Sequence, residues 1–249
     1  MKLSELIERT LFYVSVPKCI SCGKKLEFTS KVYCPDCKLE LFDAYSRNCS
    51  RCNKILSECQ CSNEYLKSER IRTVIKLFRY IQREENYVAN SLIYSLKKDN
   101  RKDVLTLASE KMSEAILSAE DKCGEYIFTN VPRRRAAVIK RGFDHAGMLS
   151  KAIAKRLSAD YKALFVSKTK AAQKTLTKSE RRTNASFKIK KNLSLSGKTV
   201  VIVDDVITTG SSIGACARLA YSMGAKRVIA AAIGIAYKDE YDGPTYAPF

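Results

Sequence analysis

The stretch that decides the fold of this 249-residue chain is Val200–Ser212, which reads VVIVDDVITTGSS. Its first four residues, Val200–Val203, are apolar and β-branched, so they predict a central parallel strand that is buried on both faces. A helix is predicted to follow over Ser211–Met223. Open α/β sheets bind ligands beyond the carboxyl ends of their strands, and Asp204 and Asp205 are expected there.

The acid pair and the turn after it have the chemistry of a sugar-phosphate site. Two adjacent carboxylates can accept hydrogen bonds from the 2- and 3-hydroxyls of a ribose and can contact a bound Mg²⁺. The turn offers backbone N–H groups, hydroxyls and a helix N-terminus to a phosphate. The residues expected in this turn are Val206, Thr208, Thr209, Gly210, Ser211 and Ser212. The alternative is an N-capped helix with incidental aspartates, but two uncompensated carboxylates at a strand end are costly without a ligand.

Two further basic segments are candidate anion sites. A strand predicted over Tyr126–Val131 ends before Arg133–Arg135, where backbone amides and guanidinium groups can meet a pyrophosphate. The Lys- and Arg-rich segment Lys168–Asn184 is expected to be a lid that folds over the same group. For any single lysine the alternative is a solvated face, so arginines are preferred. The arginines assigned to anion contacts are Arg133, Arg134, Arg141 and Arg182.

The chain divides into three regions. Residues 1–65 are rich in cysteine, residues 66–124 are expected to be a mostly helical lead-in, and residues 125–249 alternate apolar runs with helical patterns, as βαβ units do. In the lead-in, Ile71, Val74, Ile75 and Phe78 recur at helical spacing, as do apolar residues near positions 92–96 and 104–117. In the last region we predict a helix over Ala146–Leu157 and strands over Ala163–Ser167 and Val228–Ile235.

Eight of the ten cysteines form four close pairs. They are Cys19, Cys22, Cys34, Cys37, Cys49, Cys52, Cys59 and Cys61. Two such pairs close a four-thiolate structural site, so two zinc ions are the leading interpretation and iron–sulfur is the rival. Sequential pairing is the simplest arrangement, and the spacing leaves a cross-braced pairing open. Gly23 supplies the positive φ of a knuckle, a short helix is expected after Cys34, and Cys123 and Cys216 are expected to be buried small hydrophobes.

The charge of the chain points to an anionic partner. The formal net charge is +19, or roughly +15 if two zinc ions are held by eight thiolates. Such a field favours nucleic acid, an anionic membrane or a phosphorylated ligand, although Lys-rich surfaces also serve solubility. No apolar run is long enough to span a membrane. Met1–Phe12 is expected to be an amphipathic helix rather than a signal peptide, so a cytoplasmic protein is expected.

Together these features resemble the ComF family, specifically the ComFC-type competence proteins. The resemblance rests on the paired cysteines, on Arg72–Lys97, on Arg141–Ala146, on Gln173–Phe187 and on the Asp204–Ser212 loop. That loop also resembles the 5-phosphoribosyl 1-pyrophosphate (PRPP) signature of type I phosphoribosyltransferases. The family usually reads Arg-Gly-Phe-Asn-Gln where this chain has Arg-Gly-Phe-Asp-His, a change that keeps the chemistry of a helix start.

The resemblance implies a zinc-binding module over residues 1–65, joined to a parallel-sheet, type I phosphoribosyltransferase-like α/β domain over residues 66–249. It also implies PRPP or a related ribose phosphate with Mg²⁺ as ligand, and single-stranded DNA and other competence proteins as partners. DNA handling during natural competence is ranked first. An active transferase with an undefined acceptor, and a regulator that senses PRPP without turnover, are the alternatives. For base stacking, Phe78, Tyr80 and Tyr87 are available, and core packing is favoured for Phe78.

Overall fold

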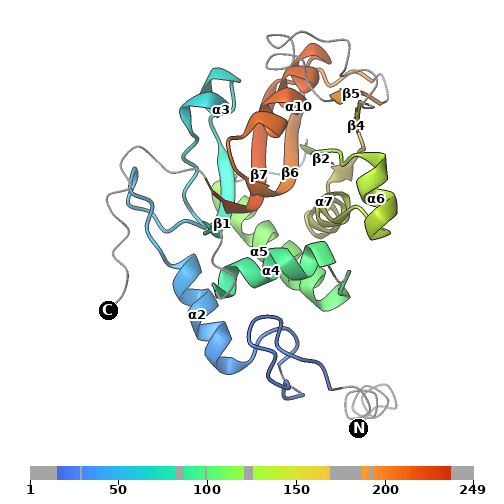
Figure 1. Cartoon of the computed structure of the whole chain (residues 1–249). Helices are drawn as coiled ribbons and strands as arrows, with labels where there is room; N and C mark the ends of the chain where they lie inside the picture. Colours follow the sequence, from blue (N-terminus) through green and yellow to red (C-terminus); the bar gives the residue numbers. More distant parts are fainter. Residues whose placement is uncertain are drawn as a thin grey trace.

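The structure is a computed structural model that describes residues 16–28, 30–81, 87–98, 100–120, 126–168, 187–190 and 193–236. At its centre lies a five-stranded sheet in the order β1-β7-β6-β2-β3, in which every neighbouring pair is parallel (Figure 1). Its strands are β1 (Val74–Arg79), β2 (Tyr126–Asn130), β3 (Asp160–Tyr161), β6 (Thr199–Ile207) and β7 (Arg227–Ile235). Met1–Phe12, Cys123, and most of the Lys168–Asn184 segment with Arg182 lie outside the described residues.

Strand β6 is the central strand, as its sequence predicted. It pairs with β2 on one side and β7 on the other, and Val200–Val203 are fully buried. The strand is longer than expected, because its pairing with β7 continues to Ile207. Asp204 and Asp205 therefore lie inside the paired part of the strand, near its carboxyl end, rather than beyond it.

Helices cover both faces of the sheet (Figure 1). On one face, α4 (Val88–Lys98), α5 (Lys102–Ala119) and α7 (His145–Arg156) form a hydrophobic core with Val201 and Val203. On the other face, α3 (Glu64–Ser68) and α10 (Ser211–Ser222) pack in a second core with Val200 and Ile202. Successive side chains along β6 thus point to opposite faces of the sheet and pack into two cores. This confirms the predicted parallel α/β architecture.

The predicted helix around residues 71–78 is wrong. Residues 74–79 form β1, which pairs with β7 as an edge strand of the main sheet. A strand buried on both faces has no polar–apolar alternation, so its apolar residues can match a helical spacing by chance. The sheet consequently begins well before residue 125, within the region expected to be a helical lead-in. The boundary after residue 65 stays a prediction.

Smaller differences concern residues 126–190. The predicted strand at Ala163–Ser167 is β4 (Phe165–Ser167), but it pairs antiparallel with β5 (Phe187–Ile189) outside the main sheet. Strand β3 and helix α6 (Arg135–Arg141) were not predicted. The helices at α4, α5, α7 and α10 and the strands at β2 and β7 confirm the sequence patterns.

The cysteine-rich segment packs against the same body. Its helix α2 (Pro35–Tyr45) begins right after Cys34, as expected, and buries Leu41 and Ala44. The ring of Tyr45 stacks on Phe78 of β1 with centroids 5.8 Å apart, and Phe78 is fully buried, which makes it a core residue. Within the described part of the chain, every helix is too short or too polar to cross a membrane.

Candidate functional site

The hydroxyl-rich loop lies open to solvent where β6 leads into α10. Thr208, Thr209, Ser211 and Ser212 are exposed, and Gly210 between them is buried. Gly210 has φ +86°, the left-handed region that favours glycine, and it caps the 12-residue helix α10. The Ser211 amide donates to Oγ1 of Thr209 at 3.3 Å. The structure therefore places the predicted loop residues together, with hydroxyls and a helix N-terminus facing water.

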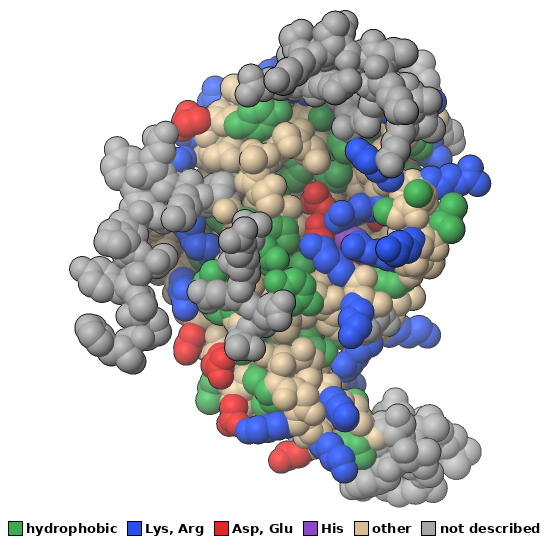
Figure 2. All heavy atoms as spheres, viewed as in Figure 1, with side chains coloured by type: hydrophobic (Ala, Val, Ile, Leu, Met, Phe, Trp, Pro, Cys, Tyr) green, Lys and Arg blue, Asp and Glu red, His purple; other side chains and the backbone are tan. Residues whose placement is uncertain are grey.

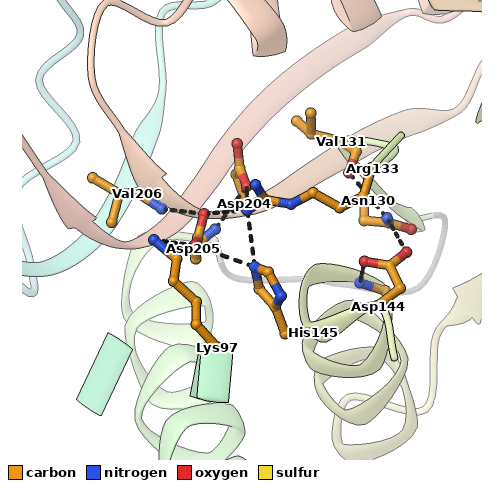
Figure 3. A network of polar contacts seen from close by, with 10 residues as sticks. Lys97, Asn130, Val131, Arg133, Asp144, His145, Asp204, Asp205 and Val206 are labelled. Atoms are coloured by element: carbon orange, nitrogen blue, oxygen red, sulfur yellow. Dashed lines mark hydrogen bonds and ion pairs between the residues drawn. The ribbon is translucent and has the colours of Figure 1, made fainter. Parts of the chain in front are cut away.

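Asp205 is buried among basic side chains (Figure 3). Its carboxylate lies 2.7 Å from Nζ of Lys97, 2.8 Å from Nη2 of Arg133 and 3.3 Å from Nε2 of His145. The expectation of two uncompensated carboxylates is thus wrong for Asp205. Because its partners come from α4, from the turn after β2 and from the start of α7, this carboxylate joins three segments behind the loop.

Asp204 has a different environment from its neighbour. Its side chain keeps 13% of its surface exposed, and its nearest cation, Nη2 of Arg133, lies 3.4 Å away. Burial and the adjacent Asp205 carboxylate raise the pKa of Asp204 well above its usual value. Burial alone would also raise the pKa of Asp205, but the hydrogen bond from His145 and the charges of Lys97 and Arg133 hold it far below its usual range. The pKa values of the two carboxyl groups are therefore shifted in opposite directions, that of Asp204 upward and that of Asp205 downward.

Two buried nitrogen atoms of this cluster lack a hydrogen-bond partner within the described part of the chain. They are Nε of Arg133 and Nδ1 of His145. Buried polar groups are nearly always satisfied, so such a concentration marks a place for water or a polar ligand. His145, the first residue of α7, is 4% exposed and belongs to this cluster.

The predicted arginines separate into different places. Arg133 reaches both aspartates, whereas Arg134 and Arg141 lie exposed at the two ends of α6, a helix without a buried residue. Figure 2 shows acidic side chains with Lys and Arg side chains next to them on this face. Arg141 is the last residue of α6, and Asp144 caps α7 by accepting from the Gly147 amide at 3.1 Å.

Lys97 was missed by the sequence analysis as a site residue. It lies at the end of α4, in the part of the chain expected to be only a lead-in. Its ion pair with Asp205 spans 108 positions of sequence, so no local motif connects the two residues. The sole signal was its place within Arg72–Lys97, a segment named only for its family resemblance.

The eight paired cysteines form two separate clusters. One contains Cys19, Cys22, Cys34 and Cys37, and the other contains Cys49, Cys52, Cys59 and Cys61. In each cluster the four sulfur atoms lie within 4.8 Å of one another. The sequential pairing is confirmed and the cross-braced one is wrong. Cys216 is buried, as expected.

The Cys19–Cys22 and Cys49–Cys52 turns have the same backbone geometry. The amide of Cys19 donates to the Lys24 carbonyl at 2.8 Å, and the amide of Cys49 donates to that of Lys54 at the same distance. The residue after the second cysteine is left-handed in both turns, with φ +74° at Gly23 and +56° at Asn53. A repeated knuckle of this kind aims two thiolates at one ion.

A buried lysine lies against the second cluster. Lys76, on β1, is 1% exposed, and its Nζ lies 3.0 Å from Sγ of Cys59 and 3.1 Å from the Cys61 carbonyl oxygen. Among the described residues no carboxylate pairs with it, and a buried ammonium needs a negative partner. Four thiolates around a divalent ion carry a net charge of −2 and supply one. The residues therefore fit a closed, structural metal site, in which a four-thiolate set favours zinc.

Comparison with known proteins agrees with this architecture. The family model "Phosphoribosyl transferase domain" matches residues 137–247. The DNA utilization protein YhgH of Escherichia coli K12 is 28% identical over 142 residues, which are 55% of this chain and 63% of YhgH. A ribose-phosphate pyrophosphokinase of Saccharolobus solfataricus is 52% identical over 60 residues, 23% of this chain and 21% of that enzyme.

Solved phosphoribosyltransferases are similar at lower identity. A hypoxanthine-guanine phosphoribosyltransferase from Bacillus anthracis is 14% identical with a TM-score of 0.35, covering 55% of this chain and 80% of the enzyme. The chain spans less than two thirds of the length of YhgH and about a fifth of the pyrophosphokinase. The sequence relatives, the parallel sheet and the cysteine clusters thus confirm the predicted resemblance to the ComF family: this chain is similar to YhgH, and a segment that matches the phosphoribosyl transferase domain follows two four-cysteine clusters.

Proposed function

We propose that this protein binds PRPP or a related ribose phosphate with Mg²⁺ at the carboxyl end of β6. We propose further that it uses this pocket in handling single-stranded DNA during natural competence, in the cytoplasm. The observation that carries the proposal is the solvent-open Thr208–Ser212 loop beside a carboxylate pair with opposite pKa shifts. Two structural zinc ions in the cysteine clusters complete the proposed composition.

The two aspartates are proposed to act differently. Asp204, the more exposed of the two, is suited to accept hydrogen bonds from the ribose hydroxyls and to contact Mg²⁺. A bound divalent cation would favour its ionised form and offset the proximity of Asp205. Asp205 instead orients Arg133 and Lys97 around the pocket. The 5-phosphate is assigned to the loop, with its hydroxyls and the amides that open α10.

The pyrophosphate of PRPP is assigned to the arginines at the end of β2. Arg133 already lies at the acid pair, and its Nε has no hydrogen-bond partner among the described residues. Guanidinium groups bind phosphate oxygens in pairs, so this orphan donor suits a phosphate oxygen. Arg134, Arg141 and Arg182 are proposed as further anion contacts.

The proposal for DNA rests on charge and on the relatives. The chain has a formal net charge of +19, and its relatives in Escherichia coli are named DNA utilization proteins. Helix α6 presents Arg135, Lys140 and Arg141 to solvent next to the pocket, with Arg134 just before it. Phosphate contacts of this kind bind without sequence preference and weaken as salt concentration rises. Other competence proteins are proposed as partners.

An active phosphoribosyltransferase is the second candidate. The match to the phosphoribosyl transferase domain and the position of Arg133 beside the acid pair favour it. Catalysis would consist of positioning and of electrostatic stabilisation of the charge that develops as pyrophosphate leaves. Release of pyrophosphate from PRPP in the presence of a nucleobase or nucleic acid separates this candidate from the first.

A thermal-shift panel with PRPP, Mg²⁺ and single-stranded DNA tests the proposal. We expect PRPP with Mg²⁺ to raise the melting temperature of the wild type, and the Asp204→Asn/Asp205→Asn double variant to lose that response. Asp160→Asn is the matched control, because Asp160 is 68% exposed on β3 and pairs only with Lys162 among the described residues. If the double variant kept the PRPP response, the site assignment would be wrong.

A further inference from the structure

A short segment connects the second cysteine cluster with the phosphate loop. We call residues Cys59–Glu69 the strap. At its start are Cys59 and Cys61, the last two cysteines of the cluster, and at its end is α3. Figure 1 shows α3 beside α10, on the face of the sheet away from α4 and α5.

The strap contacts the loop directly. Nδ2 of Asn63 donates to the Thr209 carbonyl at 3.3 Å, while its Oδ1 caps α3 by accepting from the Leu66 amide at 2.8 Å. Leu66 is fully buried, and a Cβ added to Gly210 would lie only 2.7 Å from its Cδ2. The backbone of the loop therefore rests on Leu66 with no room for a side chain.

The same helix also holds the start of α10. A Cβ added to Gly214 would meet Tyr65 and Glu69 at 3.0 Å, and Glu69 forms an ion pair with Arg218. Both the loop and the first turns of α10 thus lie against α3. Because α3 has only five residues, it cannot be a stable helix without such tertiary contacts.

The other end of the strap is tied to the cluster and to β1. Lys76 bridges Sγ of Cys59 and the carbonyl of Cys61. The amide of Val74 donates to the Gln60 carbonyl at 3.1 Å, and Nη1 of Arg51, inside the second knuckle, donates to the Ser62 carbonyl at 2.8 Å. The path of the strap therefore depends on where the four sulfur atoms are held.

The first cluster is anchored elsewhere. Arg101, which precedes α5, donates to the carbonyls of Lys18 and Lys31 at 3.3 and 3.4 Å. The hydroxyl of Tyr33 lies 3.1 Å from Oγ of Ser91 on α4. Two knuckles with the same geometry are thus attached to different parts of the domain. The effect of the first cluster on the phosphate loop can therefore be compared with that of the second.

We infer that metal in the Cys49, Cys52, Cys59 and Cys61 cluster pre-organises the phosphate loop through the strap and Lys76. Metal binding fixes the strap at Cys59 and Cys61, and the strap positions Leu66 and Asn63 under the loop. Loss of this metal releases the loop from its ligand-ready position, and affinity falls because the loop must then be ordered on binding. The inference rests on the proposed function, since it makes the second metal site a structural control on the sugar-phosphate pocket.

Matched knuckle variants test the inference. Cys49→Ser/Cys52→Ser and Cys19→Ser/Cys22→Ser each remove one buried and one exposed cysteine from one cluster. Zinc content is measured by mass spectrometry, and amide hydrogen exchange is followed in peptides covering residues 206–214. We expect each variant to lose one zinc ion, but only the Cys49→Ser/Cys52→Ser variant to exchange faster in the loop and to bind PRPP with Mg²⁺ about tenfold more weakly.

A second variant removes the contact and keeps the metal. Asn63→Ala should speed exchange in the same peptides and weaken PRPP binding severalfold, with two zinc ions retained. Asn48→Ala is its control, because Asn48 is exposed in the same module and bonds to Asn53. Asn63→Ala and Asn48→Ala also test the inference if the Cys49→Ser/Cys52→Ser variant exchanges fast throughout the sheet because it has unfolded.

The inference is overturned if loop exchange is unchanged in Asn63→Ala, or if the two knuckle variants affect the loop equally. A wild-type protein without affinity for PRPP would refute the proposed function instead. In that case the exchange measurements would still show whether the second metal site positions the loop, so the two failures are distinguishable.

Discussion

Replacing Asp205 by asparagine should destabilise the protein far more than the same change at Asp204. The Asp205 side chain is 6% exposed and neutralises Lys97 and Arg133, which are 29% and 30% exposed. Removing one partner of a buried ion pair costs about 3–5 kcal/mol, because the other charge stays buried. Both cations keep some access to water, so the expected loss is about 2–3 kcal/mol. At about 2–4 °C per kcal/mol, the melting temperature should fall by roughly 4–12 °C.

The neighbouring Asp204→Asn variant is the matched control. The folded pKa of Asp204 is raised, so its contribution to stability is present below its unfolded pKa and is lost as pH rises through the folded value. The raised pKa means that the fold disfavours the ionised form of Asp204, so replacing it by neutral asparagine should leave stability unchanged or raise it by about 1 kcal/mol at most.

The pH dependence gives a second check on the same pair. The folded pKa of Asp205 is depressed, so its contribution is present above the unfolded value of about 4 and is lost as pH falls below it. Urea unfolding of wild type and both variants should therefore show a constant deficit for Asp205→Asn from about pH 5 to 8, shrinking below about pH 4. Equal losses for both variants, or no loss for Asp205→Asn, would refute the account of this cluster.

Three further predictions follow from the site. Purified protein should contain two zinc ions per chain by mass spectrometry, and a strong chelator should lower its melting temperature; a single ion would contradict the assignment of both clusters. Gly210→Ala should lose about 1–3 kcal/mol in urea unfolding, because alanine is strained at φ +86° and its Cβ would overlap Leu66. Binding of PRPP with Mg²⁺ should release a proton from Asp204 and strengthen as pH rises through its raised pKa; calorimetry in buffers of different ionisation enthalpy checks this, and heats that are independent of buffer would contradict it.

The central strand and its loop could be predicted because their signals are local. The apolar run Val200–Val203 indicates a strand that is buried on both faces, and the turn at Gly210 indicates that a helix follows. The same burial misled the interpretation of β1, where Val74, Ile75 and Phe78 fit a helical spacing although they belong to a strand. Lys76 within that apolar run was the available signal, since a lysine there needs a specific partner.

The partners of Asp205 could not be predicted because they come from distant segments. Lys97 and Arg133 reach it only once α4 and the turn after β2 are packed at the end of β6. Arg133 was expected to contact a pyrophosphate, and its contact with Asp205 depends on the order of strands in the sheet. The pairing of the cysteines was likewise open, because spacing alone fits either arrangement while the fold brings together only consecutive pairs.

A crystal structure of the protein grown with PRPP and Mg²⁺ would test the central claim most directly. We predict difference density for a phosphate against the amides of residues 209–212, with the ribose hydroxyls on Asp204. Density for the ligand elsewhere on the protein, or an empty loop at millimolar PRPP in a crystal that leaves it accessible, would contradict the assignment of this bend as a sugar-phosphate site.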